Sequence, residues 1–174
     1  MLRIVTNDRI IPRFWGYTIS FRHPNLQFIR TIMEYSKIYT AKDEHIDVQG
    51  IMDGLYYPFY MEWCRHDFIR EVLGFDFETE ARNGVYMVLS SYTLSFIRSL
   101  KKGDQFSVTC EVFRDKGGLP KLHFKQLILM NKKVVTKAVF SGTCVPAAGG
   151  RPYLPETVLD KLKDAAELEV SQMT

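Results

Sequence analysis

The chain has 174 residues, enough to bury the core of one domain without disulfide or metal support. Hydrophobic residues make up 46% and charged residues 25%, a balance that excludes a disordered chain. The net charge of +3 is too small and too dispersed to favour nucleic-acid binding. No apolar run approaches the ~20 residues that span a bilayer.

Residues 1–31 are rich in arginine and contain a single acid, Asp8. Organellar transit peptides share this bias, but serine is nearly absent and Pro12 and Pro24 would break an amphipathic helix. We expect a flexible or targeting extension here. The predicted location is the cytoplasm, or a plastid or other organelle if this segment is a targeting signal.

The first predicted strand covers residues 33–41, in a domain that we place at residues 32–155. A helix is predicted from Leu55 to Leu73, with Gly74 as its stop signal. Its first half is apolar nearly all round, which is typical of a buried helix.

After Gly84 the pattern changes to period two, which predicts strands at 85–98, 105–114, 121–130 and 134–145. Tight turns are predicted at 115–118 (DKGG) and 131–133 (NKK). The C-terminal part, residues 156–174, is expected to be a surface helix and tail. The helix covers 155–168, with Leu159, Leu162 and Ala166 on one stripe.

The predicted order is one strand, a buried helix and four antiparallel strands in a meander. A curved sheet wrapped around the helix covers more than one helix face. The fold class is therefore α+β: a hotdog fold, with a five-stranded antiparallel sheet around one long central helix. A single protomer would leave an apolar strand edge uncovered, so we expect a homodimer or homotetramer.

The segment around Asp47 carries the candidate chemistry. A carboxylate there would lie in a turn just before the N-terminus of the buried helix, where free N–H groups and the helix dipole favour negative charge. The N–H groups of Gly54 and Leu55 could polarise a thioester carbonyl, and Asp47 could attack the acyl carbon or activate water. Asp53 before Gly54 is also an ordinary helix cap.

The stretch from Asp47 to Phe68 resembles the hotdog thioesterases that include 4-hydroxybenzoyl-CoA thioesterase and the Tol–Pal-associated acyl-CoA thioesterases. Their pattern maps onto the following positions: Asp47, Gly50, Tyr57, Glu62 and Arg65. Plant plastid acyl-lipid thioesterases and cyanobacterial naphthoyl-CoA thioesterases are more similar still. They share the run that begins Arg65-His66, the stretch from Phe96 to Asp104 and the closing Arg151-Pro152.

This resemblance, which covers roughly residues 34–155, implies hydrolysis of an acyl-CoA or acyl-carrier-protein thioester to a free acid and a thiol. It makes Asp47 the nucleophile or general base and the Gly54 amide the carbonyl-polarising donor. Many bacterial members carry His or Asn at the position of Gly54 and Tyr or Asn at that of Asp53. No cofactor is implied beyond the CoA or phosphopantetheine of the substrate.

The remaining candidates would bind substrate: Gly50, Asp53, Tyr57, Glu62, Arg65, Ser91, Arg98, Lys101 and Lys102. Basic residues at strand ends and turns could meet the phosphates of CoA or a carrier protein, or could be solvated surface: Lys101, Lys102, Arg114, Lys116 and Lys121. Glu62, His66 and Arg70 share a helical stripe that favours a structural network.

Cysteine and histidine give structural or negative predictions. Cys64, Cys110 and Cys144 lie in apolar stretches without a CxxC pair, which predicts buried free thiols. The histidines lack ligand spacing, so no metal is expected.

Two rival functions stay open. A hotdog hydratase or dehydratase would need a His–Asp or His–Glu pair, and no histidine is expected at the helix mouth. A non-catalytic acyl-CoA-binding module would use Asp47 only to cap its loop.

Overall fold

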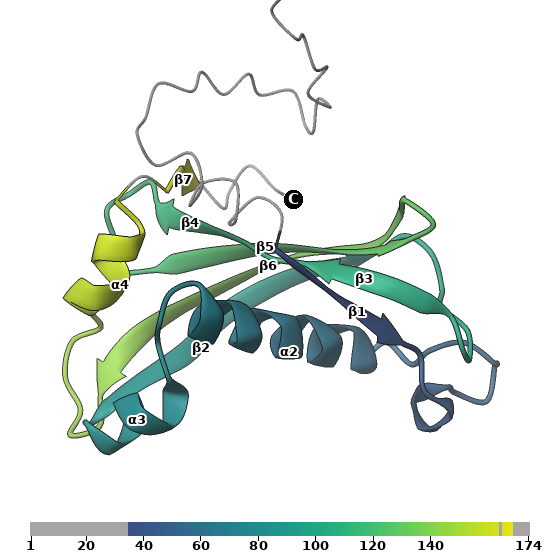
Figure 1. The fold of residues 1–174 in the computed structure, drawn as a ribbon, viewed down its shortest axis with the longest axis horizontal. Helices are drawn as coiled ribbons and strands as arrows, with labels where there is room; N and C mark the ends of the chain where they lie inside the picture. The colour runs from purple at the N-terminus through teal and green to yellow at the C-terminus, as the bar shows by residue number, and fades with distance from the viewer. Residues whose placement is uncertain (1–34, 164, 169–174) are drawn as a thin grey trace, which may run out of the picture.

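A computed structural model describes residues 35–163 and 165–168, and Figure 1 shows a helix lying across one face of a curved antiparallel sheet. The predicted extension at 1–31 lies outside the described residues. In chain order the elements are β1 (Ser36–Thr40), η1 (Asp43–His45), α2 (Tyr56–Glu71), α3 (Phe77–Arg82), β2 (Val85–Phe96), β3 (Gln105–Thr109), β4 (Glu111–Asp115), β5 (Leu122–Met130), β6 (Lys133–Pro146), α4 (Glu156–Lys161) and β7 (Glu167–Leu168).

The sheet has seven strands rather than the predicted five. The segment predicted as one strand at 105–114 is broken at Cys110, whose N–H donates to Tyr35 O outside the ladder, and both halves pair with β5. The extra strand, β7, pairs in parallel with the end of β4. Strand β1 pairs with β3. The five predicted strand segments therefore all take part in the sheet, with the third divided into β3 and β4.

The meander prediction is wrong for β2, because this strand pairs with β6 and not with β3. Residues 97–104 connect β2 to β3, and Leu100 in this connection is buried against the start of α2. A connection of this length lets β3 join the opposite half of the sheet, where it pairs with β1 and β5. Strand β2 therefore forms one edge of the sheet.

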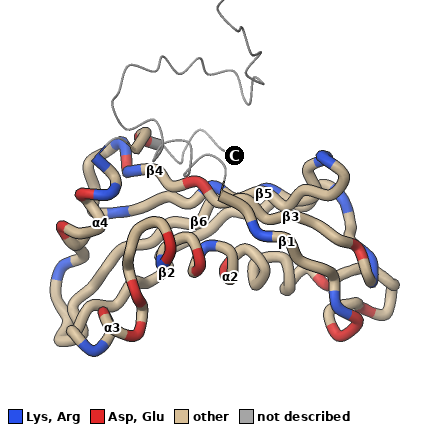
Figure 2. The backbone as a smooth tube through the Cα atoms, in the orientation of Figure 1, with Lys and Arg blue, Asp and Glu red and all other residues tan. Residues whose placement is uncertain are grey.

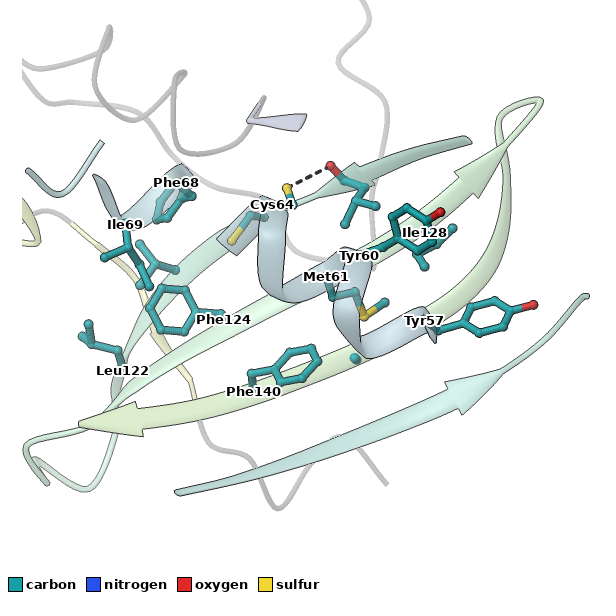
Figure 3. Close-up of a cluster of buried hydrophobic side chains, with 14 of the residues drawn as sticks. Tyr57, Tyr60, Met61, Cys64, Phe68, Ile69, Leu122, Phe124, Ile128 and Phe140 are labelled. Carbon is teal, nitrogen blue, oxygen red and sulfur yellow. Dashed lines mark hydrogen bonds between the residues drawn. The ribbon is translucent and has the colours of Figure 1, made fainter. Parts of the chain in front are cut away.

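The predicted helix is confirmed as α2, with Pro58 in its first turn and Gly74 at φ +70° just beyond its end. One face is buried on the sheet, and Figure 3 shows its side chains meeting Phe124, Ile128 and Phe140. The opposite face exposes Phe59 and Trp63. The sheet of one protomer thus covers a single face of a helix whose first half is apolar nearly all round.

The C-terminal helix prediction is only partly correct. Helix α4 ends at Lys161, and residues 167–168 form β7 instead of a continued helix. The buried positions are Val158 and Leu162, four residues apart, whereas Leu159 is exposed. Both buried side chains belong to the main core cluster, so α4 packs as part of the domain.

Two further predictions are confirmed by side-chain and turn geometry. The three cysteines are buried, and burial raises the pKa of the Cys64 thiol to about 12. Asn131 and Lys132 adopt φ values of 52° and 62°, as a two-residue turn between β5 and β6 requires. None of the described helices is long and apolar enough to cross a membrane.

A buried hydrogen-bonded trio joins β4, β5 and β6. His123 Nε2 lies 3.0 Å from Asp115 Oδ1 and His123 Nδ1 lies 2.8 Å from Ser141 Oγ. Because a carboxylate only accepts, Nε2 carries the proton and, in the neutral ring, Ser141 donates to Nδ1. Ser141 is 4% exposed, so the trio lacks the open approach that a nucleophilic serine needs, and we assign it a structural role.

We expect Phe68→Ala to lower the free energy of unfolding by about 3–5 kcal/mol, because the ring is fully buried against Tyr35 and Phe124. Phe59→Ala on the same helix is the matched control, since its ring is 49% exposed, and should cost about 1 kcal/mol or less. Urea denaturation measures both. Equal losses would contradict the assignment of the buried face.

We expect Asp115→Asn to cost about 1–3 kcal/mol at pH 7, since it removes a charged hydrogen bond to His123. That bond holds the pKa of Asp115 below its ordinary value, so its stabilising effect is complete above about pH 4 and is lost as the pH falls further. Urea denaturation should therefore show a smaller difference in the free energy of unfolding between the wild type and Asp115→Asn at pH 3 than at pH 6. An equal difference at both pH values would contradict a stabilising charged hydrogen bond between Asp115 and His123.

Candidate active site

A short hairpin presents Asp47 just before α2. Ile46 and Met52 form an antiparallel bridge, and Asp47 N donates to Ile51 O at 2.8 Å. Gly50 closes the turn by donating to Asp47 O at 3.0 Å, and its φ of +78° favours a residue without Cβ. The Asp-x-x-Gly spacing therefore has a backbone cause: Gly50 makes the turn and Asp47 lies at its start.

The Asp47 carboxylate is half-buried and lies against its own loop. Oδ1 accepts the N–H of Gln49 at 2.8 Å and of Ile51 at 3.4 Å, while Oδ2 accepts the Gln49 side-chain amide at 3.1 Å. These bonds fix the orientation of the carboxylate and keep it from turning out into bulk water. The same bonds would also be made by an aspartate that only caps the loop.

The N-terminus of α2 offers one of its two candidate donors to a ligand. Asp53 Oδ1 accepts the N–H of Leu55 at 2.8 Å, and Asp53 O accepts the N–H of Tyr56 at 3.0 Å. Asp53 thus satisfies the N–H groups of Leu55, the N-cap residue of α2, and of Tyr56, its first residue. The expected cap is corrected here, because Asp53 lies two residues before the N-cap and its side chain makes no bond to the first helical turn. Among residues 35–163 and 165–168 nothing accepts the N–H of Gly54, so this donor is open to a carbonyl oxygen.

Residues 97–104 hold the hairpin and the helix start in place. Met52 N donates to Leu100 O at 2.7 Å, and Leu100 N donates to the Tyr57 hydroxyl at 3.0 Å. Burial of Tyr57 raises the pKa of its hydroxyl, which therefore stays neutral and keeps its oxygen available to Leu100. Asp53 N also donates to His45 O at 2.9 Å. These bonds give the candidate site a rigid base.

Three of the basic candidates lie in or beside this connection. Lys102 Nζ is 2.9 Å from Asp43 Oδ2, the Arg98 guanidinium donates to Val134 O at 2.6 Å, and the Lys101 N–H donates to Asp104 Oδ2 at 2.8 Å. The other predicted basic residues lie at the opposite end of the sheet, around the turn between β4 and β5: Arg114, Lys116 and Lys121. Figure 2 marks basic residues in blue along the backbone at both ends of the sheet, among other places.

The structure does not bring Glu62, Arg65 or Ser91 to the helix mouth. Glu62 pairs with His66 at 3.5 Å, and Ser91 lies at mid-strand on β2 opposite Ser141. The Arg65 guanidinium is buried beneath α2, where it lies 4.1 Å from the centre of the Phe140 ring and donates to Gln126 Oε1 at 2.8 Å. Burial lowers the pKa of Arg65. Its contacts tie the helix to the sheet.

The expectation that no histidine lies at the helix mouth is wrong. His45 stacks on Tyr56, the first residue of α2, with ring centres 3.9 Å apart. Its Nδ1 lies 3.0 Å from the Tyr60 hydroxyl, which itself donates to Thr40 O at 3.0 Å. The ring is buried and engaged, so it braces the helix start. No pattern in the polar segment around His45 signalled this position.

Phe96 is a second residue that the sequence pattern did not single out for the site. It is the last residue of β2, and a Cβ built on Gly54 would lie 3.3 Å from the tip of its ring. The space beside Gly54 is therefore bounded by an aromatic ring. Only the tertiary pairing of β2 with β6 brings this ring to the helix.

Comparison with known proteins gives one partial sequence match. No protein-family model matches the chain. A chloroplastic acyl-acyl carrier protein thioesterase of Arabidopsis thaliana is 30% identical over 72 residues, which are 41% of this chain and 37% of that protein. The chain thus matches little more than a third of the length of this curated relative.

Solved structures match over most of the domain. A 1,4-dihydroxy-2-naphthoyl-CoA thioesterase of Synechocystis superposes with a TM-score of 0.67 at 10% identity, covering 75% of this chain and 96% of that one. A DHNA-CoA thioesterase of Staphylococcus aureus gives 0.63 at 17% identity, covering 74% and 85%. A hypothetical protein of Aquifex aeolicus gives 0.66 at 23% identity, covering 74% and 98%. At these identities the likeness establishes the fold and confirms the predicted resemblance at that level: the chain has the hotdog fold.

Proposed function

We propose that this protein hydrolyses acyl thioesters of CoA or of acyl-carrier protein to a free acid and a thiol. The observation that carries the proposal is the open N–H of Gly54 at the N-terminus of α2, seven residues after the held carboxylate of Asp47. A helix N-terminus favours the negative charge that develops on a carbonyl oxygen under attack. The thioesterases among the fold neighbours and the Arabidopsis relative support this reaction class.

In the proposed reaction the thioester oxygen accepts the Gly54 N–H, and Asp47 acts on the carbonyl carbon in one of two ways. As a nucleophile it forms a mixed anhydride and expels the thiolate, after which water releases the acid. As a general base it takes a proton from the water that attacks the carbonyl carbon. Both routes need the carboxylate to be fixed, which the Gln49 and Ile51 N–H bonds provide.

The basic residues near residues 97–104 support an anionic carrier. Lys101 and Lys102 are exposed within the connection that anchors the helix start, and Arg98 lies at its beginning, just after β2. We propose that these residues meet the phosphates of CoA or phosphopantetheine. No metal or redox group has a role in this proposal, and the groups of CoA or phosphopantetheine enter with the substrate.

One observation favours the alternative of a non-catalytic acyl-CoA-binding module: the Asp47 carboxylate is hydrogen-bonded within its own loop. A hydratase is less well supported, since His45 is buried and bonded to Tyr60. The location stays a prediction: the cytoplasm, or a plastid or other organelle if residues 1–31 are a targeting segment. The chloroplastic Arabidopsis relative supports the plastid.

We further propose a homodimer formed through β2. Among the described residues no second strand pairs with β2 beside β6, and β2 carries no charged residue over its twelve positions, so it is tan in Figure 2. It exposes several large apolar side chains: Tyr86, Val88, Leu89, Tyr92 and Phe96. A long, apolar, unprotected edge is a template for pairing with a second chain. Strand β1, at another edge of the sheet, has five residues and includes Lys37.

Asp47→Asn tests the chemical role. Asparagine keeps an oxygen that accepts the loop N–H bonds but is neither a base nor an effective nucleophile. We expect thiol release from a panel of acyl-CoA and acyl-carrier-protein thioesters to fall by about 10²- to 10⁴-fold with an unchanged melting temperature. Asp160→Asn, on the exposed face of α4, is the control. Turnover that survives Asp47→Asn would remove Asp47 from the mechanism. A wild type that binds the thioesters without hydrolysing them would favour the non-catalytic acyl-CoA-binding module.

Leu89→Glu tests the dimer, because it places a charge on the apolar edge strand. Sedimentation velocity should show a dimer for the wild type and a monomer for this variant. Leu119→Glu, at an equally exposed leucine in the turn between β4 and β5, should stay dimeric. A wild type that sediments as a monomer would contradict the proposal.

A further inference from the structure

The space beside the open Gly54 N–H is shaped by a single aromatic side chain. A Cβ built on Gly54 would lie 3.3 Å from Phe96 Cζ and 3.9 Å from both Cε1 and Cε2. The equal distances to the two ε carbons mean that the ring points its tip at Gly54. The tip of the ring therefore lies directly beside the Gly54 backbone that carries the open N–H.

Phe96 is held in this position from two sides. Its ring meets the ring of buried Tyr57 edge-on, with centres 5.2 Å apart and planes at 80°. Its backbone ends β2, and the next two residues, Ile97 and Arg98, both donate their N–H groups to Val135 O. The side chain is nevertheless 58% exposed, so it forms a wall of the helix mouth and is not a core residue.

The backbone of Gly54 has no positive φ that would demand glycine, whereas Gly50 nearby does. The only close contact of a Cβ at position 54 among the described residues is the Phe96 ring. Glycine at this position therefore leaves room for the ring, and the two residues form one steric unit.

We propose that Phe96 is the specificity-determining residue of the acyl site and selects acyl groups whose α-carbon carries no branch. This inference rests on the proposed thioesterase activity. When the thioester oxygen accepts the Gly54 N–H, the α-carbon lies two bonds from that oxygen and faces the ring tip. In a straight chain or a flat conjugated group, the side of the α-carbon that faces the ring carries at most a hydrogen atom and fits beside Phe96. A 2-methyl substituent on that side would clash with Phe96 Cζ.

The test compares straight-chain acyl-CoA thioesters with their 2-methyl analogues, at butyryl, decanoyl and hexadecanoyl length. In the wild type, kcat/KM should favour the unbranched member of each hydrolysed pair. Phe96→Ala should lower that preference by about 10-fold or more, the range in which a single pocket methyl group acts. Ile97→Ala is the matched control, because it trims the neighbouring exposed apolar residue and should leave the preference unchanged.

A second variant checks the direction of the ring. Phe96→Tyr adds a hydroxyl at the tip that faces Gly54 and should lower kcat/KM for both members of a pair, with an unchanged melting temperature. An unchanged preference in Phe96→Ala, or an equal change in Ile97→Ala, would overturn the inference while leaving the thioesterase proposal intact. A wild type that hydrolyses none of the straight-chain thioesters would overturn both.

Discussion

The candidate site depends on the anchoring of the first turn of α2 to residues 97–104. Tyr57 accepts the Leu100 N–H while Met52 donates to the Leu100 carbonyl, so one buried residue holds both the helix and the Asp47 hairpin. Buried backbone groups that lose such partners cost about 1–3 kcal/mol each. The arrangement therefore positions the donor and the carboxylate through the backbone, which deforms less readily than exposed side chains do.

At the start of α2, one of the two candidate N–H donors is hydrogen-bonded within the chain and the other is open. Asp53 binds the N–H of Leu55, the N-cap residue, yet the preceding N–H of Gly54 keeps its capacity to donate. Orphan N–H groups are expected at every helix start. Here one of them lies at an exposed glycine beside an aromatic wall, next to a hairpin with a fixed carboxylate. Asp53 and the Gly54 donor come from one segment and the Phe96 ring from another, and the fold joins the two.

The protomer leaves two apolar surfaces uncovered, and both belong to elements that build the site. Strand β2 ends in Phe96, and no strand in the described part of the chain pairs with its outer edge. Helix α2 exposes Phe59 and Trp63 on the face away from the sheet. A second chain pairing with β2 would lie close to Phe96, so the proposed dimer and the shape of the acyl site are physically linked.

Much of the fold could be predicted from the sequence because periodicity and turn residues are local signals. Gly74 marked the end of α2, and the alternation over residues 121–130 marked β5. Pairing partners are not local, so the neighbours of β2 were predicted wrongly. The break at Cys110 depends on a bond to Tyr35 that alternation cannot reveal.

The same reasoning separates the parts of the site. Asp47, Gly50 and Gly54 belong to one continuous motif and could be read from spacing. Phe96 and His45 could not, because each reaches the helix start only through a tertiary contact. The sequence suggested one phosphate-binding role for all the basic residues at strand ends and turns. In the structure Lys101 and Lys102 lie at one end of the sheet and Arg114 lies at the other.

The central claim is that the Gly54 N–H polarises the substrate carbonyl beside Asp47. A crystal structure of the protein with an acyl-CoA analogue in which a methylene group replaces the thioester sulfur tests it most directly. The account predicts the ketone oxygen within hydrogen-bond distance of Gly54 N, with the Asp47 carboxylate facing the carbonyl carbon directly or through one water. A ketone bound away from the start of α2, with Gly54 N still open, would contradict it.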